Sequence, residues 1–153
     1  MIHRRSFAVS ISALVLVAFA LPLRALAAPP PGDPTLPAAD WKAIRKVIGD
    51  QRAALVKGDA KKGFSYAAPG IRAQFGTPEN FLAMVRASYG ALTSARYAEF
   101  LEGAVIDGRV IQPLRLVAPD NSVQVALYTM EKQPDGRWRI AGCVLAPSTV
   151  QAA

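Results

Sequence analysis

Hydrophobic residues recur every three or four positions in the first half of the chain, which is the spacing of an amphipathic helix. The first run consists of Trp41, Ile44, Ile48 and Leu55. It predicts a helix that has Asp40 as its N-cap and ends at Gly58. Asp59 can cap a short second helix that reaches Ala68, just before Pro69.

A third helix is predicted from its start signal. Thr77 can cap the helix through its hydroxyl, and Pro78 suits the first helical position. The residues that then fall on one face are Phe81, Met84, Val85, Ser88 and Tyr89. Gly90 is expected to end this helix.

After residue 95 the period changes to two, which indicates strands. Residues 96–102 alternate weakly and residues 123–132 clearly. Asp107-Gly108-Arg109 between two Val-Ile pairs is typical of a hairpin, and the Pro134-Asp135-Gly136 turn precedes a last strand. The residues expected to share one face of that strand are Trp138, Ile140 and Val144.

Helices followed by antiparallel strands indicate an α+β domain. We expect the N-terminal helices to pack on one face of a curled antiparallel sheet of four or five strands. This single domain is predicted to span residues 40–146, with a flexible tail at residues 147–153. The length of 153 residues supports one such domain with its own core.

The residues before the domain have the features of an export signal. Residues 1–6 are basic, residues 7–23 are uncharged and mostly apolar, and Ala25-Leu26-Ala27 offers small residues to signal peptidase. Residues 1–27 are therefore predicted to be a signal peptide that is cleaved before Ala28. An uncleaved membrane anchor is the alternative.

Arg4-Arg5-Ser6-Phe7 resembles a twin-arginine export signal, although an ordinary signal also accounts for the arginine pair. Either route predicts a periplasmic or secreted protein. Residues 28–39 contain five prolines and read as an extended linker, with a proline-rich docking motif as the alternative.

The amino-acid composition excludes several kinds of metal site and catalytic pair. The formal charge is +7, but removing residues 1–27 leaves fifteen basic and eleven acidic residues and takes away the only histidine, His3. A chain without histidine has no His-ligated metal site and no Ser-His or Cys-His nucleophile pair. We predict no metal and no cofactor.

The basic residues are scattered and do not form the stripe that nucleic acid requires, so we predict no nucleic-acid partner. We also predict no stable membrane span after the signal peptide is cleaved.

Several stretches of the folded region resemble a known family. They are residues 64–71, residues 75–85, Tyr89 and residues 135–143. They resemble an exported bacterial family labelled domain of unknown function 4864. The resemblance implies a cone-shaped α+β roll of the nuclear-transport-factor-two-like and cystatin-like group. It implies no catalytic residue, because the family has no assigned activity.

Rolls of that group often enclose an apolar pocket. The aromatic residues that are candidates to line one here are Tyr66, Phe75, Phe81, Tyr89, Tyr128 and Trp138. Ordinary core packing is the alternative for the same residues. We expect a non-catalytic exported module that binds a small apolar ligand or takes part in assembly. Its expected partners are such a ligand, an envelope protein, or a second copy bound through the sheet face.

The alternative is an isomerase or dehydratase that uses a buried carboxylate. Glu99 and Glu131 are the only catalytic candidates. Glu131 shares a strand face with Val123, Val125 and Leu127, so it could point inward at the open end of the sheet. A glutamate at the end of a strand is more often simply solvated, and this is the other interpretation of these residues.

Cys143 is the sole cysteine of the chain. Two interpretations stay open for it in an oxidising compartment. It is either packed as a small hydrophobic residue or paired with the cysteine of a partner.

Overall fold

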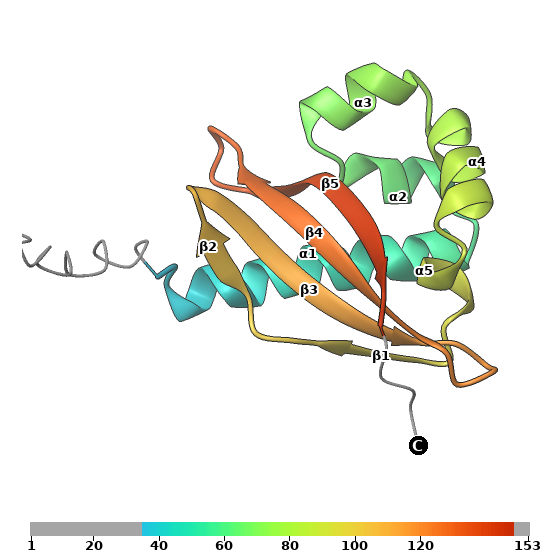
Figure 1. The fold of residues 1–153 in the computed structure, drawn as a ribbon. Coiled ribbons are helices and arrows are strands. Elements are labelled where there is room, and N and C mark those ends of the chain that lie inside the picture. The colour runs from blue at the N-terminus through green and yellow to red at the C-terminus, as the bar shows by residue number, and fades with distance from the viewer. Residues whose placement is uncertain (1–34, 149–153) are drawn as a thin grey trace, which may run out of the picture. The chain divides into compact units, whose positions relative to one another are not determined.

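The computed structural model describes residues 35–148, in which five helices precede five strands (Figure 1). The helices are α1 (Ala38–Val56), α2 (Ala60–Ser65), α3 (Pro69–Phe75), α4 (Pro78–Ser88) and α5 (Ala91–Ser94). The strands are β1 (Tyr97–Phe100), β2 (Ala104–Ile106), β3 (Arg109–Val117), β4 (Val123–Lys132) and β5 (Trp138–Pro147). The predicted α+β class is confirmed. The predicted signal peptide, most of the predicted linker and the end of the predicted tail lie outside the described residues.

All five strands belong to one open antiparallel sheet. Its order is β1-β3-β4-β5, and β2 pairs with β3 on the same side as β1. The register places Gln112 of β3 beside Tyr128 of β4, and Tyr128 beside Cys143 of β5. The predicted hairpin between β2 and β3 is present, with Asp107 and Gly108 both at positive φ.

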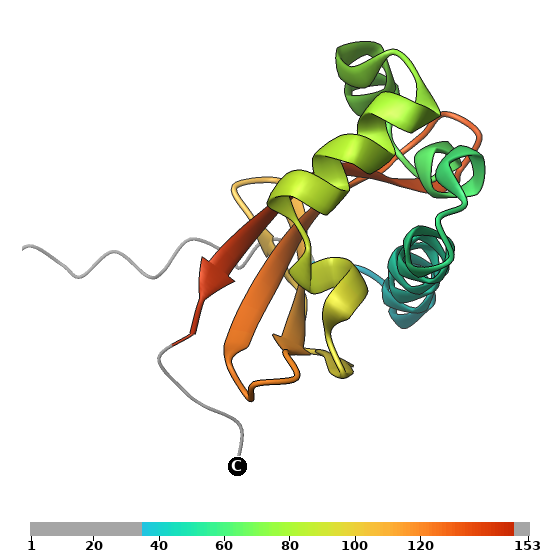
Figure 2. The same cartoon turned by 90° about the vertical axis from the view of Figure 1, so that its right-hand side faces the viewer.

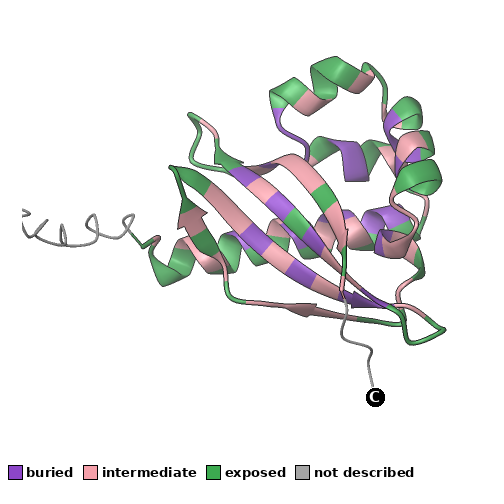
Figure 3. Ribbon diagram, viewed as in Figure 1, coloured by how far each residue is buried: buried purple, intermediate pink, exposed green. Residues whose placement is uncertain are grey.

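The helices lie on one side of the sheet (Figures 1 and 2). We call this side the inner face; its buried residues on β3 and β4 are Gln112, Leu114, Leu116, Ala126, Tyr128 and Met130. Ile44 and Ile48 of α1 are fully buried against them and complete the main core. Buried positions accordingly alternate with less buried ones along β3 and β4 (Figure 3). The opposite side of the sheet is called the outer face.

Helix α1 begins earlier than the sequence suggested. Its N-cap is Pro37, so the prediction that Asp40 caps the helix is wrong. Asp40 instead lies in the first turn, where its carboxylate accepts hydrogen bonds from Trp138 Nε1 at 2.8 Å and Lys132 Nζ at 3.0 Å. These bonds lower the pKa of the Asp40 carboxyl. They attach the start of α1 to the β4–β5 hairpin.

The other helix signals are confirmed in part. Gly58 has φ +72° and turns the chain away from α1. Asp59 Oδ1 caps α2 by accepting a hydrogen bond from Lys62 N at 3.0 Å. Thr77 Oγ1 caps α4 by accepting one from Asn80 N at 3.2 Å. Helix α2 ends at Ser65 rather than Ala68. The next residues leave the helix because they pair with the edge of β5.

Two helices were not predicted. Helix α3 starts at Pro69, which we had taken as the end of a helix, and it has no buried residue whose spacing could reveal it. Helix α5 is only four residues long. Neither is a candidate for crossing a membrane, and no other helix within residues 35–148 is long and apolar enough to do so.

The prediction of which β5 residues share one face is correct only for the first half of the strand. Trp138 and Ile140 are buried, whereas Val144 is 62% exposed. Met130 pairs with Ile140 but Thr129 pairs with Gly142, so Ala141 is an extra residue in β5. This β-bulge inverts the alternation of side chains beyond it. Cys143 and Leu145, and not Val144, therefore pack against the core.

One buried polar residue joins three parts of the domain. Gln112 has no exposed surface, and its Nε2 donates to the carbonyl oxygens of Leu101 at 2.7 Å and Pro113 at 2.9 Å. Its Oε1 accepts a hydrogen bond from Arg45 Nε of α1 at 3.3 Å. Gln112 thus connects α1, the segment between β1 and β2, and the middle of β3.

Replacing Gln112 by Leu should destabilise the domain by about 2–4 kcal/mol, because three side-chain hydrogen bonds are lost and buried polar groups are left without partners. The matched control is Gln133→Leu, since Gln133 makes only one long side-chain bond, at 3.5 Å to the carbonyl oxygen of Glu131. We expect less than about 0.5 kcal/mol for the control. Urea unfolding measures both values, and equal stabilities of the two variants would contradict the role assigned to Gln112.

Candidate functional site

An apolar cavity of about 180 Å³ lies between the helices and the β4–β5 end of the sheet. Side chains from α1, α3 and α4 surround it, and β4 and β5 contribute the wall on the side of the sheet. Among the described residues that line it, none carries a charge. The cavity therefore offers an apolar space with a few uncharged polar groups.

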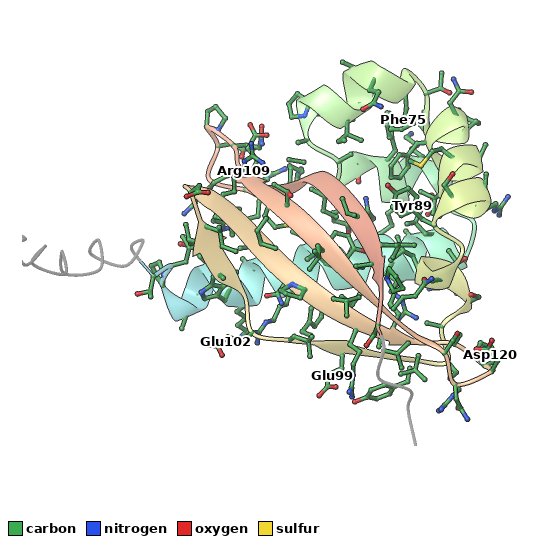
Figure 4. All side chains as sticks on the ribbon, in the orientation of Figure 1. Phe75, Tyr89, Glu99, Glu102, Arg109 and Asp120 are labelled. Carbon is green, nitrogen blue, oxygen red and sulfur yellow. The ribbon has the colours of Figure 1, made fainter. Side chains whose placement is uncertain are left out.

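Four of the six predicted pocket residues line this cavity: Phe75, Phe81, Tyr89 and Tyr128. The rings of Phe75 and Phe81 are in edge contact, with centroids 5.8 Å apart. Phe75 and Tyr89 lie at the end of the domain formed by α3 and α4 (Figure 4). The structure thus brings together aromatic residues from a short helix, a longer helix and the central sheet.

Tyr66 and Trp138 do not line the cavity. Trp138 is buried in the main core and donates its indole hydrogen to Asp40. Tyr66 is partly buried against the same core. For these two residues the packing interpretation fits the structure better than the pocket interpretation.

Tyr128 is the most unusual residue of the lining. Only 1% of its surface is exposed, and its hydroxyl has no hydrogen-bond partner in the described part of the chain. Burial raises the pKa of this hydroxyl, since an anion would be poorly solvated there. Tyr128 therefore presents a protonated, unpaired hydroxyl group within the apolar interior.

Two other polar side chains of the lining are engaged in bonds to the backbone. The Tyr89 hydroxyl donates to the carbonyl oxygen of Cys143 at 2.9 Å, which links the end of α4 to β5. Gln51 of α1 is buried, and its Nε2 donates to the carbonyl oxygen of Gly63 at 3.2 Å. These bonds hold the walls of the cavity together.

Neither catalytic candidate is near the cavity. Glu99 forms an ion pair with Arg115 at 2.6 Å, and its side chain is 42% exposed. It lies on β1, well away from Phe75 and Tyr89 (Figure 4). Glu131 is exposed on the outer face, because the neighbouring Met130 points inward. The expectation that Glu131 points into the fold is wrong.

Some lining residues were not identified from the sequence. Ile71 and Gln74 belong to α3, which had no helical signal, and Cys143 was expected to be packed or paired with a partner and not to line a cavity. The β-bulge that directs Cys143 inward depends on pairing with β4 and leaves no local pattern. Within residues 35–148, no group of three or more His, Cys, Asp or Glu side chains could hold a metal ion.

Cys143 allows a test of the cavity wall. It is half-buried, and burial raises the pKa of its thiol to about 12. At pH 8 only about one thiol in ten thousand is then ionised, so native protein should react slowly with an alkylating reagent. The rate should rise about tenfold per pH unit up to about pH 11, whereas protein unfolded in urea should reach its plateau near pH 9. The measurement is the loss of free thiol with time.

Rapid stoichiometric labelling of native protein at pH 7 would contradict this assignment. A disulfide-linked dimer on a non-reducing gel would do the same, and would favour the alternative in which Cys143 pairs with a partner.

Comparison with known proteins gives one match. The chain matches no curated protein and no solved structure. A family model described as a domain of unknown function (DUF4864) matches residues 37–153, which is most of the chain. This match extends from the start of α1 through all five strands. The chain therefore belongs to the DUF4864 family of domains of unknown function.

Proposed function

We propose that this protein is a non-catalytic binding module that holds a small apolar molecule in the cavity beside Tyr128. The observation that carries the proposal is the apolar space of about 180 Å³ with no charged residue in its lining. An engineered apolar cavity of about 150 Å³ binds benzene. Pockets for drug-sized ligands begin at about 300 Å³. A compact molecule with a single ring fits this space, and a sterol does not.

The size of the cavity also argues against a simple packing defect. Protein interiors contain few voids larger than a water molecule. The apolar side chains that line such a space lack packing partners on one side. A ligand that fills the space would supply those contacts and remove the apolar surface from water.

Helix α3 provides the route by which a ligand enters. It contributes Ile71, Gln74 and Phe75 to the cavity wall, and its apolar residues Ile71 and Phe75 are only partly buried. Displacing it breaks the ring contact between Phe75 and Phe81 but uncovers no fully buried residue of the helix itself. Gly76, at φ +73°, follows the helix and can absorb a change in backbone direction.

The enzyme alternative has less support. An isomerase or dehydratase needs a group that transfers a proton at the reacting atom. Glu99 and Glu131 lie outside the cavity, and its lining contains no acidic or basic side chain. The polar groups present there can orient a ligand by hydrogen bonding.

The proposed place of action is outside the cytoplasmic membrane, as a periplasmic or secreted bacterial protein. The basic, apolar and small-residue sections of residues 1–27 support export.

We also propose that the domain belongs to the nuclear-transport-factor-two-like and cystatin-like group of rolls. The order of helices before a curled antiparallel sheet supports that grouping.

A second observation favours self-assembly. Of the five large hydrophobic residues that are exposed in the described chain, four lie on the outer face of the sheet: Tyr97, Ile106, Leu127 and Val144. Leu127 lies opposite both Pro113 and Val144, so these apolar side chains adjoin one another in the middle of the face. Contiguous exposed apolar patches mark interaction sites. We propose that a second copy of this chain covers the face, because each acidic residue on it lies opposite an arginine. Glu99 lies opposite Arg115, and Glu131 lies opposite Arg139.

The dimensions of the sheet suit a dimer. It is four strands wide, and its two longest strands have ten residues each. Strand spacing and rise give a flat footprint on the order of 600 Å². A standard interface buries roughly 800 Å² per partner, so the whole outer face would have to take part.

Filling the cavity should abolish ligand binding. Cys143→Met places a longer, flexible side chain in the space, so the affinity for toluene and for methylenecyclohexane should fall at least about tenfold. Val144→Met is the matched control, because Val144 is adjacent but 62% exposed on the outer face. Ligand-observed NMR titration of the mature protein measures the affinities. No binding of either compound to wild-type protein, or equal loss in both variants, would contradict the proposal.

A charge on the outer face should prevent dimerisation. Leu127→Lys is expected to give a monomer in sedimentation velocity at a concentration where wild-type protein is dimeric, since two lysines would be desolvated at the interface. Val56→Lys is the control: Val56 is 55% exposed at the end of α1, away from the sheet. A monomeric wild-type protein, or dimers in both variants, would exclude this interface.

A further inference from the structure

We propose that the ligand of the cavity is an uncharged molecule with one acceptor oxygen, such as a cyclic ketone, and that the Tyr128 hydroxyl donates a hydrogen bond to that oxygen. This inference rests on the proposed binding function. It adds the chemical class of the ligand and the residue that selects it.

The first argument is the state of the Tyr128 hydroxyl. Three buried side-chain polar atoms lack a partner among the described residues: Arg115 Nε, Gln124 Oε1 and Tyr128 Oη. Of these residues only Tyr128 lines the apolar cavity. A buried hydroxyl without a partner has lost its bonds to water and gained none in return. An acceptor in the cavity would supply the missing partner.

The second argument is the absence of charge from the lining. No charged side chain lines the cavity, so a carboxylate or an ammonium group would leave water there without a directly facing counter-ion, which is unfavourable. The Arg52 guanidinium acts on the Tyr128 hydroxyl from nearby, but it is already bonded to the carbonyl oxygens of Leu92 and Ala95. Burial also keeps the Tyr128 hydroxyl protonated by raising its pKa. The group is therefore available as a donor throughout the ordinary pH range, and the molecule that it holds is neutral.

The third argument concerns the neighbouring polar groups. The Tyr89 hydroxyl already donates to the carbonyl oxygen of Cys143 at 2.9 Å. A bound water would need two to four polar partners, and most of the lining is apolar. One acceptor on an otherwise apolar molecule satisfies Tyr128 and leaves the remaining surface in apolar contact.

The test uses two probes of the same shape, cyclohexanone and methylenecyclohexane, which differ only in an oxygen and a methylene group. Tyr128→Phe should weaken the binding of cyclohexanone roughly three- to tenfold, the effect of one hydrogen bond, and should leave that of methylenecyclohexane unchanged or stronger. Tyr97→Phe is the matched control, because Tyr97 is 47% exposed on the outer face. Its affinities for both probes should equal those of the wild type.

A second measurement does not depend on the variant. The carbonyl carbon of ¹³C-labelled cyclohexanone should shift downfield on binding to wild-type protein, relative to its position in an apolar solvent. The melting temperature of Tyr128→Phe should not fall, because no bond within the protein is lost.

The outcomes separate the two proposals. If neither probe binds the wild-type protein, the binding function itself is wrong. Both probes could bind while Tyr128→Phe changes the two affinities equally or changes neither of them. In that case the role assigned to Tyr128 is wrong, and the cavity selects its ligand by shape alone. An unshifted carbonyl resonance also overturns that role.

Discussion

The extra residue in β5 is the constraint on which the cavity depends. Ala141 has no partner in β4, so the side chains beyond it change sides. Without the bulge, Val144 would face the helices and Cys143 would face solvent. With it, Cys143 lies beside Tyr128 on the inner face. Just before the bulge, Ile140 bonds through its backbone to Tyr66 at 2.9 Å and to Ala68 at 2.8 Å. The same short segment of β5 thus forms part of the cavity wall and attaches the chain between α2 and α3 to the sheet.

Hydrogen bonds divide the helical layer into a firmly attached part and a loosely attached part. Arg52 of α1 donates to the carbonyl oxygens of Leu92 at 2.8 Å and Ala95 at 3.2 Å, which fixes the turn that leads into β1. With Asp40 at its start and Arg45 bonded to Gln112, α1 is joined to the rest of the domain along its length. Helix α3 has no buried residue at all. Helix α1 and the sheet thus form a firmly attached wall of the cavity, and α3, which is only partly buried, forms another wall.

Features encoded by a few adjacent residues could be predicted from the sequence. The caps of Asp59 and Thr77, the end of α1 just before Gly58 and the extent of β4 depend on residues close to the backbone groups that they affect. Predictions that depended on distant pairing were less successful. Asp40 was assigned to a cap because its bond to Trp138 spans 98 positions. Val144 and Glu131 were assigned to the wrong faces because period-two alternation does not reveal a bulge or which face meets the helices.

The same distinction explains why the aromatic residues were a better guide to the site than the carboxylates. A large aromatic side chain at helical or strand spacing is directed to the interior by its own hydrophobicity, so Phe75, Phe81, Tyr89 and Tyr128 meet there. The face on which a glutamate lies is set by the register of its strand, and here that face is exposed to water. What the sequence could not show is that one of these aromatic groups keeps an unpaired hydroxyl. Phenylalanine at position 128 would fill the same space without burying that group. Since tyrosine carries a cost to the stability of the empty domain, its hydroxyl is best explained by a partner that residues 35–148 do not themselves provide.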